Sequence, residues 1–197
     1  MIKEIFDRLC SFFLIVLLLP LLVLIAIGIV ATSGFPIFFK QERIGQYGRV
    51  FSIIKFRTMS GKAKFSVAAM EQNRITRFGR FLRKTKLDEL PELLNILKGD
   101  MSFVGPRPDV AGYADKLEGD DRVVLRLKPG LTGVASLKYH NENLLLAQQS
   151  NPKEYNDNVI WPDKVRLNKL YAEKQTFWLD LKILLYTALC KNVEGFE

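Results

Sequence analysis

Two adjacent carboxylates, Asp88 and Glu89, are the residues of this chain best placed to do chemistry. They stand directly before a predicted helix, in which the i, i+3, i+4, i+7 spacing of a buried face is made by Leu90, Leu93, Leu94 and Leu97. Pro91 predicts the first turn of this helix, where its missing N–H needs no partner, and Gly99 predicts the end. Asp88 is therefore predicted as the N-cap, where free N–H groups and the helix dipole lower a carboxylate pKa.

Helix capping explains such a pair without any catalysis, so the case for chemistry rests on the sequence around it. A short link leads to Pro106-Arg107-Pro108, which holds an arginine between two residues of fixed φ. Such a rigid backbone suits the presentation of a guanidinium to a phosphate or a planar base. A rigid surface turn also explains the prolines, but it explains less well the mainly apolar residues 101–104 that precede them.

Basic residues occur on two other predicted elements. Residues 37–44 and 50–57 predict a β-hairpin, whose second strand puts Lys55 and Arg57 on one face. A second element is an amphipathic basic helix, weakened at Gly79 and marked by Arg74, Arg77, Arg80 and Arg83. The strand cations either contact a phosphate or are solvated, and the helix cations either serve a site or lie near lipid phosphates.

An apolar run near the N-terminus predicts a membrane segment, because residues 9–39 contain no Asp, Glu, Lys or Arg. A transmembrane helix needs about 20 apolar residues, so Phe12–Ala31 is long enough to cross a bilayer. Pro20 removes a backbone donor, so we expect a break into Phe12–Leu19 and Leu21–Ala31. Neither half would span roughly 30 Å of hydrocarbon.

Positive charges flank this run on both sides, at Lys3, Arg8, Lys40, Arg43 and Arg49. Because positive residues favour the cytoplasmic side, these charges favour a re-entrant helix that bends at Pro20 and returns to the same face. A single-pass helix with a tolerated proline kink stays open. A cleaved signal peptide fits poorly, because the run exceeds the usual length of about 7 to 15 residues and bulky residues follow it at 35–39.

The net charge of +8 suits nucleic acid, anionic lipid or a phosphate-bearing substrate, and the apolar run favours the last two. We expect two parts, a membrane helix at residues 1–36 and one catalytic domain at residues 37–197. Cys10 and Cys190 have no spacing typical of a metal cage or a disulfide framework, and they are compatible with a reducing compartment.

Six ordered motifs carry a family resemblance: FKQERIG at 39–45, KFRTM at 55–59, LDELPEL at 87–93, GDMSFVGPRP at 99–108, KPGLTG at 128–133 and FWLDLK at 177–182. With them the chain resembles, nearly end to end, the bacterial sugar transferases, also called small monotopic phosphoglycosyl transferases. The resemblance implies an enzyme that moves a sugar 1-phosphate from a UDP-sugar to undecaprenyl phosphate and releases UMP. This reaction would be the first membrane step of a glycan assembly pathway.

The resemblance also implies a place and a fold. The place is the bacterial inner (cytoplasmic) membrane, with the catalytic domain facing the cytoplasm and the helix re-entrant. The fold is α+β and mainly helical, with a proline-broken membrane helix, a small β-hairpin and amphipathic interfacial helices. The implied partners are the UDP-sugar, undecaprenyl phosphate and the phospholipid membrane, not nucleic acid, and a homo-oligomer stays open.

In the mechanism that the resemblance implies, Asp88 is the nucleophile and forms a covalent aspartyl phosphosugar. Glu89 holds Mg²⁺ together with substrate phosphates. The remaining matches are expected to bind substrate: the diphosphate by Lys55, Arg57, Arg83 and Arg107, and the nucleotide by a loop that Pro106 and Pro108 shape.

One motif departs from the family pattern. After the turn at 132–133 many relatives read Ala-Gln-Val-Asn-Gly-Arg-Asn, whereas this chain reads Ala-Ser-Leu-Lys-Tyr-His-Asn at 135–141. Either His140, the only histidine, or Lys138 supplies the missing arginine contact, or the sugar pocket differs. A structural role for His140 fits the sequence at least as well.

The C-terminal part predicts supporting helices at 143–149, at 163–174 and along an apolar stripe at 177–189, which packs on the core, lies in the membrane interface, or does both. Two other functions stay open. One is a lipid-linked glycosyltransferase that moves only the sugar and releases UDP. The other is a membrane-tethered basic module that binds anionic lipid or nucleic acid without catalysis. The sequence names neither the sugar, the polyprenol length nor the glycan.

Overall fold

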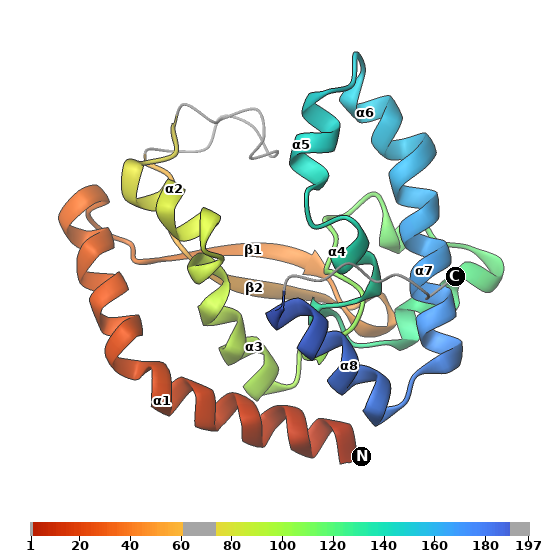
Figure 1. The fold of residues 1–197 in the computed structure, drawn as a ribbon, viewed down its shortest axis with the longest axis horizontal. Helices are drawn as coiled ribbons and strands as arrows, with labels where there is room; N and C mark the ends of the chain where they lie inside the picture. Colours follow the sequence, from red (N-terminus) through yellow and green to blue (C-terminus); the bar gives the residue numbers. More distant parts are fainter. Residues whose placement is uncertain (1, 61–73, 190–197) are drawn as a thin grey trace. The chain divides into compact units, whose positions relative to one another are not determined.

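The computed structural model describes residues 2–60 and 74–189, so Cys190 lies outside the described part. It is mainly helical with two small sheets, which confirms the predicted α+β class and the hairpin (Figure 1). The first elements are α1 (Ile2–Ser33), β1 (Phe38–Ile44), η1 (Gln46–Gly48), β2 (Val50–Phe56), α2 (Arg77–Lys84), η3 (Leu87–Glu92) and α3 (Leu93–Lys98). Then follow β3 (Ser102–Val104), η4 (Ala114–Lys116), η5 (Gly119–Arg126), β4 (Gly130–Thr132), α4 (Val134–Lys138), α5 (Glu142–Ala147), α6 (Pro152–Tyr155), η6 (Asn156–Ile160), α7 (Trp161–Lys174) and α8 (Phe177–Ala188).

The contacts within the chain group it into two units. Ile5–Glu42 and Ser52–Gly99 form what we call the N-terminal unit. Met1–Glu4, Arg43–Phe51 and Asp100–Glu197 form the C-terminal unit. Each strand of the hairpin crosses from one unit into the other, so the hairpin belongs to both.

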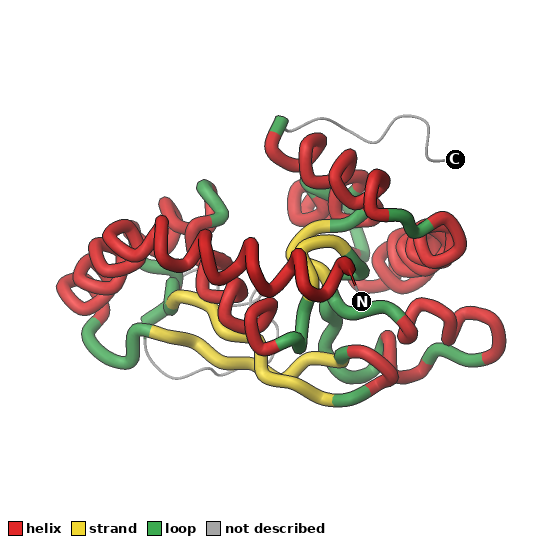
Figure 2. The backbone as a smooth tube through the Cα atoms, turned by 90° about the horizontal axis from the view of Figure 1, so that it is seen from below, coloured by secondary structure: helices red, strands yellow, loops and turns green. Residues whose placement is uncertain are grey.

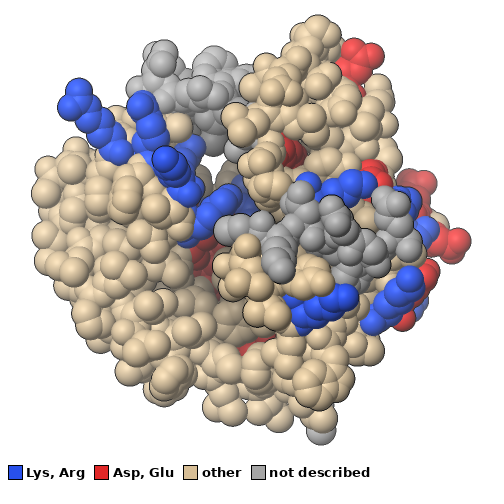
Figure 3. Space-filling model, viewed as in Figure 1, with Lys and Arg blue, Asp and Glu red and all other residues tan. Residues whose placement is uncertain are grey.

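Helix α1 is one continuous helix that contains Pro20, so the predicted division into two separate halves is not confirmed. Figure 1 shows that its axis changes direction along its length, as expected when a proline removes one hydrogen bond of the helix. Only 11% of its most apolar stretch is buried, and among the described residues it alone is long and apolar enough to cross a bilayer. The surface over α1, at the lower left of Figure 3, shows neither acidic nor basic side chains.

The first half of α1 buries polar side chains. Asp7 and Ser11, four residues apart and therefore on one face, are 5% and 0% exposed. The Ser11 hydroxyl donates to the backbone oxygen of Leu93 at 2.6 Å, at the start of α3. This largely apolar helix is thus fixed on α3 through a polar contact.

The second half of α1 buries apolar side chains at the same spacing. Ile25 and Ile29 pack in a core cluster with Phe56 of β2 and Leu82 of α2. Full burial of one such side chain stabilises a fold by about 1.5 to 3 kcal/mol, so this cluster holds α1, β2 and α2 together.

The hairpin strands β1 and β2 run side by side, as the yellow tubes of Figure 2 show. Helix α2 follows and begins at Arg77, later than predicted, because Thr76 caps it by accepting a hydrogen bond from the Gly79 amide at 2.9 Å. A Cβ at Gly79 would lie 2.1 Å from the backbone oxygen of Thr58. The glycine that weakens the helix in the sequence is therefore required by close packing.

In the C-terminal unit, β3 and β4 pair in parallel, with Ser102 opposite Gly130 and Val104 opposite Thr132. A buried core, against which Trp161 packs, consists of Ile44, Ala114, Leu117, Val124, Leu125 and Val165. Helices α5 and α7 confirm the helices predicted at 143–149 and 163–174.

Helix α8 turns a partly polar face inward. The Asp180 carboxylate is 5% exposed and accepts hydrogen bonds from Lys3 and from the Tyr171 hydroxyl, each at 2.5 Å. Ile183 is the fully buried apolar residue of this face. The exposed large apolar side chains of α8 and its end are Phe177, Trp178, Leu185 and Leu189. Much of the predicted apolar stripe therefore faces outward.

Candidate active site

Asp88 and Glu89 lie in the first turn of η3. This turn begins at Leu87, and the residue before it, Lys86, adopts a left-handed backbone with φ of 58°. The prediction that Asp88 is the N-cap is wrong, because the chain already turns helically at Leu87 and Pro91 lies inside the η3 turn. The end of the helix is as predicted, since Gly99 caps α3 with φ of 92°. Asp88 is 8% exposed, so its carboxylate is held in the protein rather than displayed on the surface.

Lys55 lies between two carboxylates of the same turn. Its ammonium is 2.7 Å from Glu89 Oε1 and 3.1 Å from Glu92 Oε1. The three side chains are mostly buried, at 18%, 12% and 2% exposed for Lys55, Glu89 and Glu92. The sequence reasoning missed Glu92, although its position three residues after Glu89 puts both on one helical face.

Asn95 fixes β2 beside this turn. Its side chain is 1% exposed, accepts from the Ile54 amide at 3.0 Å and donates to the Ser52 carbonyl at 2.8 Å. These two hydrogen bonds hold the β2 backbone on either side of Ile53. They therefore fix the position of the backbone from which the Lys55 side chain projects. A polar residue between Leu94 and Ile96, in the interior of an apolar helix, was the sequence signal for such a role.

Arg83 approaches the pair from α2. Its Nε donates to the hydroxyl of Thr58 at 2.8 Å, and Thr58 is 5% exposed. Its positive charge acts on the Asp88 carboxylate. Asp88, Glu89, Lys55 and Arg83 are thus brought together from η3, β2 and α2, all in the N-terminal unit.

Burial raises the pKa of Asp88 above the ordinary value of an aspartate, and the neighbouring Glu89 carboxylate raises it further. Lys55, Arg83 and the backbone N–H of Asp88 itself act in the opposite direction and only partly offset the rise. The expectation of a lowered pKa at a helix start is therefore wrong, because desolvation of the buried Asp88 carboxylate outweighs the effects that lower its pKa.

The side chain of Arg57 points to a different place. Its guanidinium donates to the backbone carbonyls of Ser33, Gly34 and Phe35, at the end of α1, with 2.6 Å to Ser33 and 2.8 Å to Phe35. Lys55, two residues earlier in the chain, is the cation that meets the carboxylates.

The Pro106-Arg107-Pro108 segment lies in the C-terminal unit and follows β3. Arg107 is exposed, whereas Pro108 is buried and its carbonyl accepts from Arg43 at 3.3 Å. All three residues line a cleft together with Trp161 and Asn168. An arginine on a backbone fixed at both sides suits recognition of an anion.

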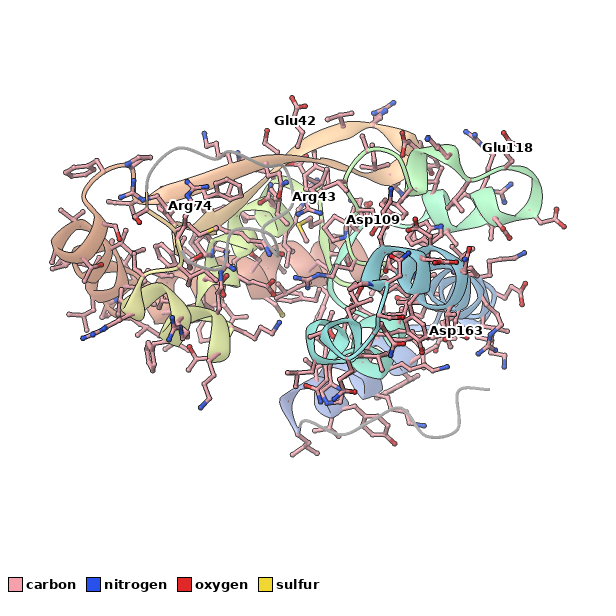
Figure 4. All side chains as sticks on the ribbon, turned by 90° about the horizontal axis from the view of Figure 1, so that it is seen from above. Glu42, Arg43, Arg74, Asp109, Glu118 and Asp163 are labelled. Atoms are coloured by element: carbon pink, nitrogen blue, oxygen red, sulfur yellow. The ribbon has the colours of Figure 1, made fainter. Side chains whose placement is uncertain are left out.

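Asp109 lines the same cleft, and Arg43 and Asp109 lie close together in Figure 4. Burial raises the pKa of Asp109 to about 6, although the charges of Lys164 and Arg43 lower it. This carboxyl therefore keeps its proton to a higher pH than an ordinary aspartate does, which the sequence did not indicate.

Lys138 and His140 are both held by local partners. Lys138 forms an ion pair with Asp163 at 2.8 Å, and Tyr139 donates to the same carboxylate at 2.8 Å. The His140 ring nitrogens lie 3.2 Å from the Leu137 carbonyl and 2.7 Å from the Asn141 side-chain amide. These contacts favour the structural alternative for His140.

Within residues 2–60 and 74–189, no three His, Cys, Asp or Glu side chains gather as a metal cage. Mg²⁺ does not need one, since one or two carboxylates and substrate phosphates commonly suffice. Glu89 offers carboxylate oxygens, the donors that Mg²⁺ prefers, so the donor chemistry fits.

The described site is a buried aspartate–glutamate pair flanked by two cations, in a unit built on a long apolar helix, and this arrangement suits a protein that handles phosphate groups beside a membrane. The chain belongs to the bacterial sugar transferase family, whose model matches residues 1–192. The family predicted from the six motifs is thereby confirmed.

Three relatives illustrate this similarity. The chain is 35% identical over 188 residues to an uncharacterized sugar transferase, EpsL, of Bacillus subtilis, covering 94% of this chain and 85% of the relative. It is 33% identical over 192 residues to a UDP-glucose:undecaprenyl-phosphate glucose-1-phosphate transferase of Klebsiella pneumoniae. This match covers 94% of this chain and 39% of the relative. A protein of the same name from Caulobacter vibrioides is 35% identical over 194 residues, and the match covers 94% of this chain and 67% of the relative. The chain thus spans about two fifths of the Klebsiella relative.

Proposed function

We propose that this protein transfers a sugar 1-phosphate from a UDP-sugar to undecaprenyl phosphate and releases UMP. The observation that carries the proposal is the Asp88–Glu89 pair, buried in the first turn of η3 and flanked by Lys55 and Arg83. The names of the Klebsiella and Caulobacter relatives, UDP-glucose:undecaprenyl-phosphate glucose-1-phosphate transferases, support the substrate classes.

The first step is attack by a carboxylate oxygen of Asp88 on the phosphorus that bears the sugar. An oxygen–phosphorus bond to Asp88 forms, the bond to the bridging oxygen of UMP breaks, and UMP leaves with the electron pair. Lys55 and Arg83 stabilise the added negative charge, because cations already fixed in a buried site lose little energy in reorganising. The product is an aspartyl phosphosugar.

In the second step, a phosphate oxygen of undecaprenyl phosphate attacks the same phosphorus. The bond to Asp88 breaks, the carboxylate is regenerated, and the sugar stays on a lipid diphosphate. Asp88 must be ionised before it attacks in the first step, and it leaves as a carboxylate in the second. Because burial raises the pKa of Asp88, the charges of Lys55 and Arg83 are needed to favour this ionised form.

Mg²⁺, when bound, would neutralise phosphate charge and orient the diphosphate. Glu89 is the residue we propose to hold it. Glu89 Oε1 accepts from Lys55 at 2.7 Å, and Glu92 offers the same ammonium a second carboxylate at 3.1 Å. Lys55 can therefore stay in the site through Glu92 when a metal ion occupies Glu89.

We also propose that α1 is re-entrant and that the protein lies on the cytoplasmic face of a bacterial inner membrane. The bend of α1, its exposed apolar surface and the positive residues at both ends support this topology. The outward apolar side chains of α8 and the exposed cations Arg77 and Arg80 of α2, over which Figure 3 shows Lys and Arg gathering, suit contact with the membrane interface.

Mass spectrometry tests the mechanism. The purified protein is incubated with Mg²⁺ and a panel of UDP-sugars without lipid acceptor, alongside Asp88→Asn. We expect a mass gain equal to one phosphosugar, located on Asp88 and absent from the variant, with a fall in turnover of at least about 10³-fold in Asp88→Asn.

Other outcomes separate the alternatives. Release of UMP only after lipid is added, without any mass gain, would replace the covalent step by direct displacement. Release of UDP would identify a transferase of the sugar alone. If no nucleotide is released with any donor and Asp88→Asn binds anionic vesicles more tightly, a non-catalytic basic module is the better description.

A further inference from the structure

The C-terminal end of α1 receives a cation from Arg57, the residue that follows β2. A helix leaves its final carbonyl groups without intrahelical partners, and its C-terminus carries partial negative charge. The last turn of α1 contains no basic residue of its own. Arg57 supplies the missing charge from 24 residues away in sequence, donating to the Ser33 carbonyl at 2.6 Å and also to those of Gly34 and Phe35.

The backbone makes the same connection. The amide of Arg57 donates to the carbonyl of Ile37 at 2.9 Å, just before β1 begins. The segment from Ser33 to Ile37 is therefore held by both the side chain and the backbone of one residue. This segment is where the chain leaves the apolar helix.

Strand β2 joins this helix end to the site. Lys55 and Arg57 are two residues apart in an extended chain, so they project to the same side. Lys55 reaches Glu89 and Glu92, and Arg57 reaches the end of α1. Phe56, between them, packs in the core cluster that contains Ile25 and Ile29 of α1.

We propose that Arg57 is a positioning residue, which locks the exit of α1 and sets the apolar helix relative to the strand that carries Lys55. It is not a ligand of the donor diphosphate. Its loss would free the 33–37 segment and impair the step that uses the membrane-embedded acceptor, while the step that uses the water-soluble donor continues. The kinetic part of this inference rests on the proposed function, whereas the structural part does not.

Hydrogen exchange in lipid nanodiscs tests the structural part. The variants are Arg57→Gln, the conservative Arg57→Lys, and Lys40→Gln, which removes the same charge from an exposed position on β1. We expect amide exchange at Gly34, Phe35 and Ile37, the residues of this segment that carry a backbone N–H, to rise about tenfold in Arg57→Gln, to rise less in Arg57→Lys, and to stay unchanged in Lys40→Gln. Equal exchange in Arg57→Gln and the native chain would overturn the proposal.

The two half-reactions test the kinetic part. In Arg57→Gln, formation of the phosphosugar adduct from a UDP-sugar without lipid should stay within about threefold of the native rate, while transfer to undecaprenyl phosphate in nanodiscs falls by about tenfold or more. A raised KM for the UDP-sugar with normal exchange at 34–37 would instead make Arg57 a substrate ligand. If the native chain forms no adduct with any donor, the proposed function fails, and the exchange experiment still decides the role of Arg57.

Discussion

The turn that carries Asp88 and the loop that carries Arg107 hold their charged groups in opposite ways. In the N-terminal unit, Lys55 is in contact with two mostly buried carboxylates, and Arg83 is bonded to a buried threonine. In the C-terminal unit, Arg107 is exposed and its backbone is fixed by a proline on each side. Groups proposed to react are thus positioned by mutual contacts, whereas the group proposed to meet a ligand is positioned by the chain itself.

This difference predicts which substitutions lower the stability of the fold and which weaken substrate binding. Removing a charge from the buried cluster leaves carboxylates in low dielectric and should damage the fold. Removing the exposed arginine should damage the interaction with substrate more than the fold. Three changes, taken from the largest expected effect to the smallest, break or sharpen this comparison.

Lys55→Met should destabilise the protein by about 3 to 5 kcal/mol, because it removes the cation from a buried ion pair that involves both Glu89 and Glu92. Thermal unfolding in detergent, followed by circular dichroism, measures the change. The double variant Lys55→Met with Glu92→Gln should recover part of the loss, since one buried charge is then removed. An unchanged unfolding temperature in Lys55→Met would mean that the cluster does not hold the fold.

Arg107→Ala should lower stability much less than Lys55→Met does, and it should lower kcat/KM for the UDP-sugar by about 10- to 150-fold, the effect of losing one charged hydrogen bond worth about 1.5 to 3 kcal/mol. Steady-state kinetics with varied donor concentration measures it. Arg126→Ala, another exposed arginine of the same unit, is the matched control and should behave like the native protein. Equal kinetics in both variants would remove Arg107 from the site.

Asp109→Asn should change how stability depends on pH. The folded pKa of Asp109, about 6, lies above its ordinary value of 3.8, so the folded state binds this proton more tightly than the unfolded state. Its stabilising contribution is full below about pH 4 and is lost as pH rises through 6. Between pH 4 and pH 7 the free energy of unfolding of the native chain should fall by about 1 to 2 kcal/mol relative to that of Asp109→Asn. The effect is smaller than the full pKa shift implies, because solvent partly reaches the carboxyl.

The measurement is thermal unfolding of both proteins at several values between pH 4 and pH 7. The difference between their curves isolates Asp109 from all other titrating groups. Parallel curves would show that the Asp109 carboxyl is not buried enough to couple its proton to folding.

Local patterns in the sequence predicted several elements correctly. The alternation around Lys55 predicted the hairpin, the leucine spacing and Gly99 predicted the helix after Asp88 and its end, and the long uncharged run predicted α1. Each of these depends on contacts between residues close in sequence, which a spacing rule can read. The order of the motifs predicted the family, which the matching family model confirms.

The same patterns gave wrong or incomplete answers where distant residues meet. The start of the Asp88 helix was wrong because a short η3 turn precedes α3, and Pro91 fits inside it. Arg57 was grouped with Lys55 because the alternation predicted both on one face of a strand, yet β2 ends at Phe56 and the partners of the two side chains differ. Lys138 was a candidate for a missing arginine, and it is paired with Asp163, 25 residues further on.

What the sequence determined by itself is the chemistry available: a carboxylate pair at a helix start, an arginine between prolines, and an apolar run that only a membrane or a core can accept. Tertiary structure alone decided the state of that chemistry. It decided that the pKa of Asp88 rises rather than falls, that Glu92 shares Lys55 with Glu89, and that Arg57 serves the end of α1. The reason is that burial and electrostatic pairing depend on which residues surround a group in space, and these residues come from β2, α2 and α1, far apart in the chain.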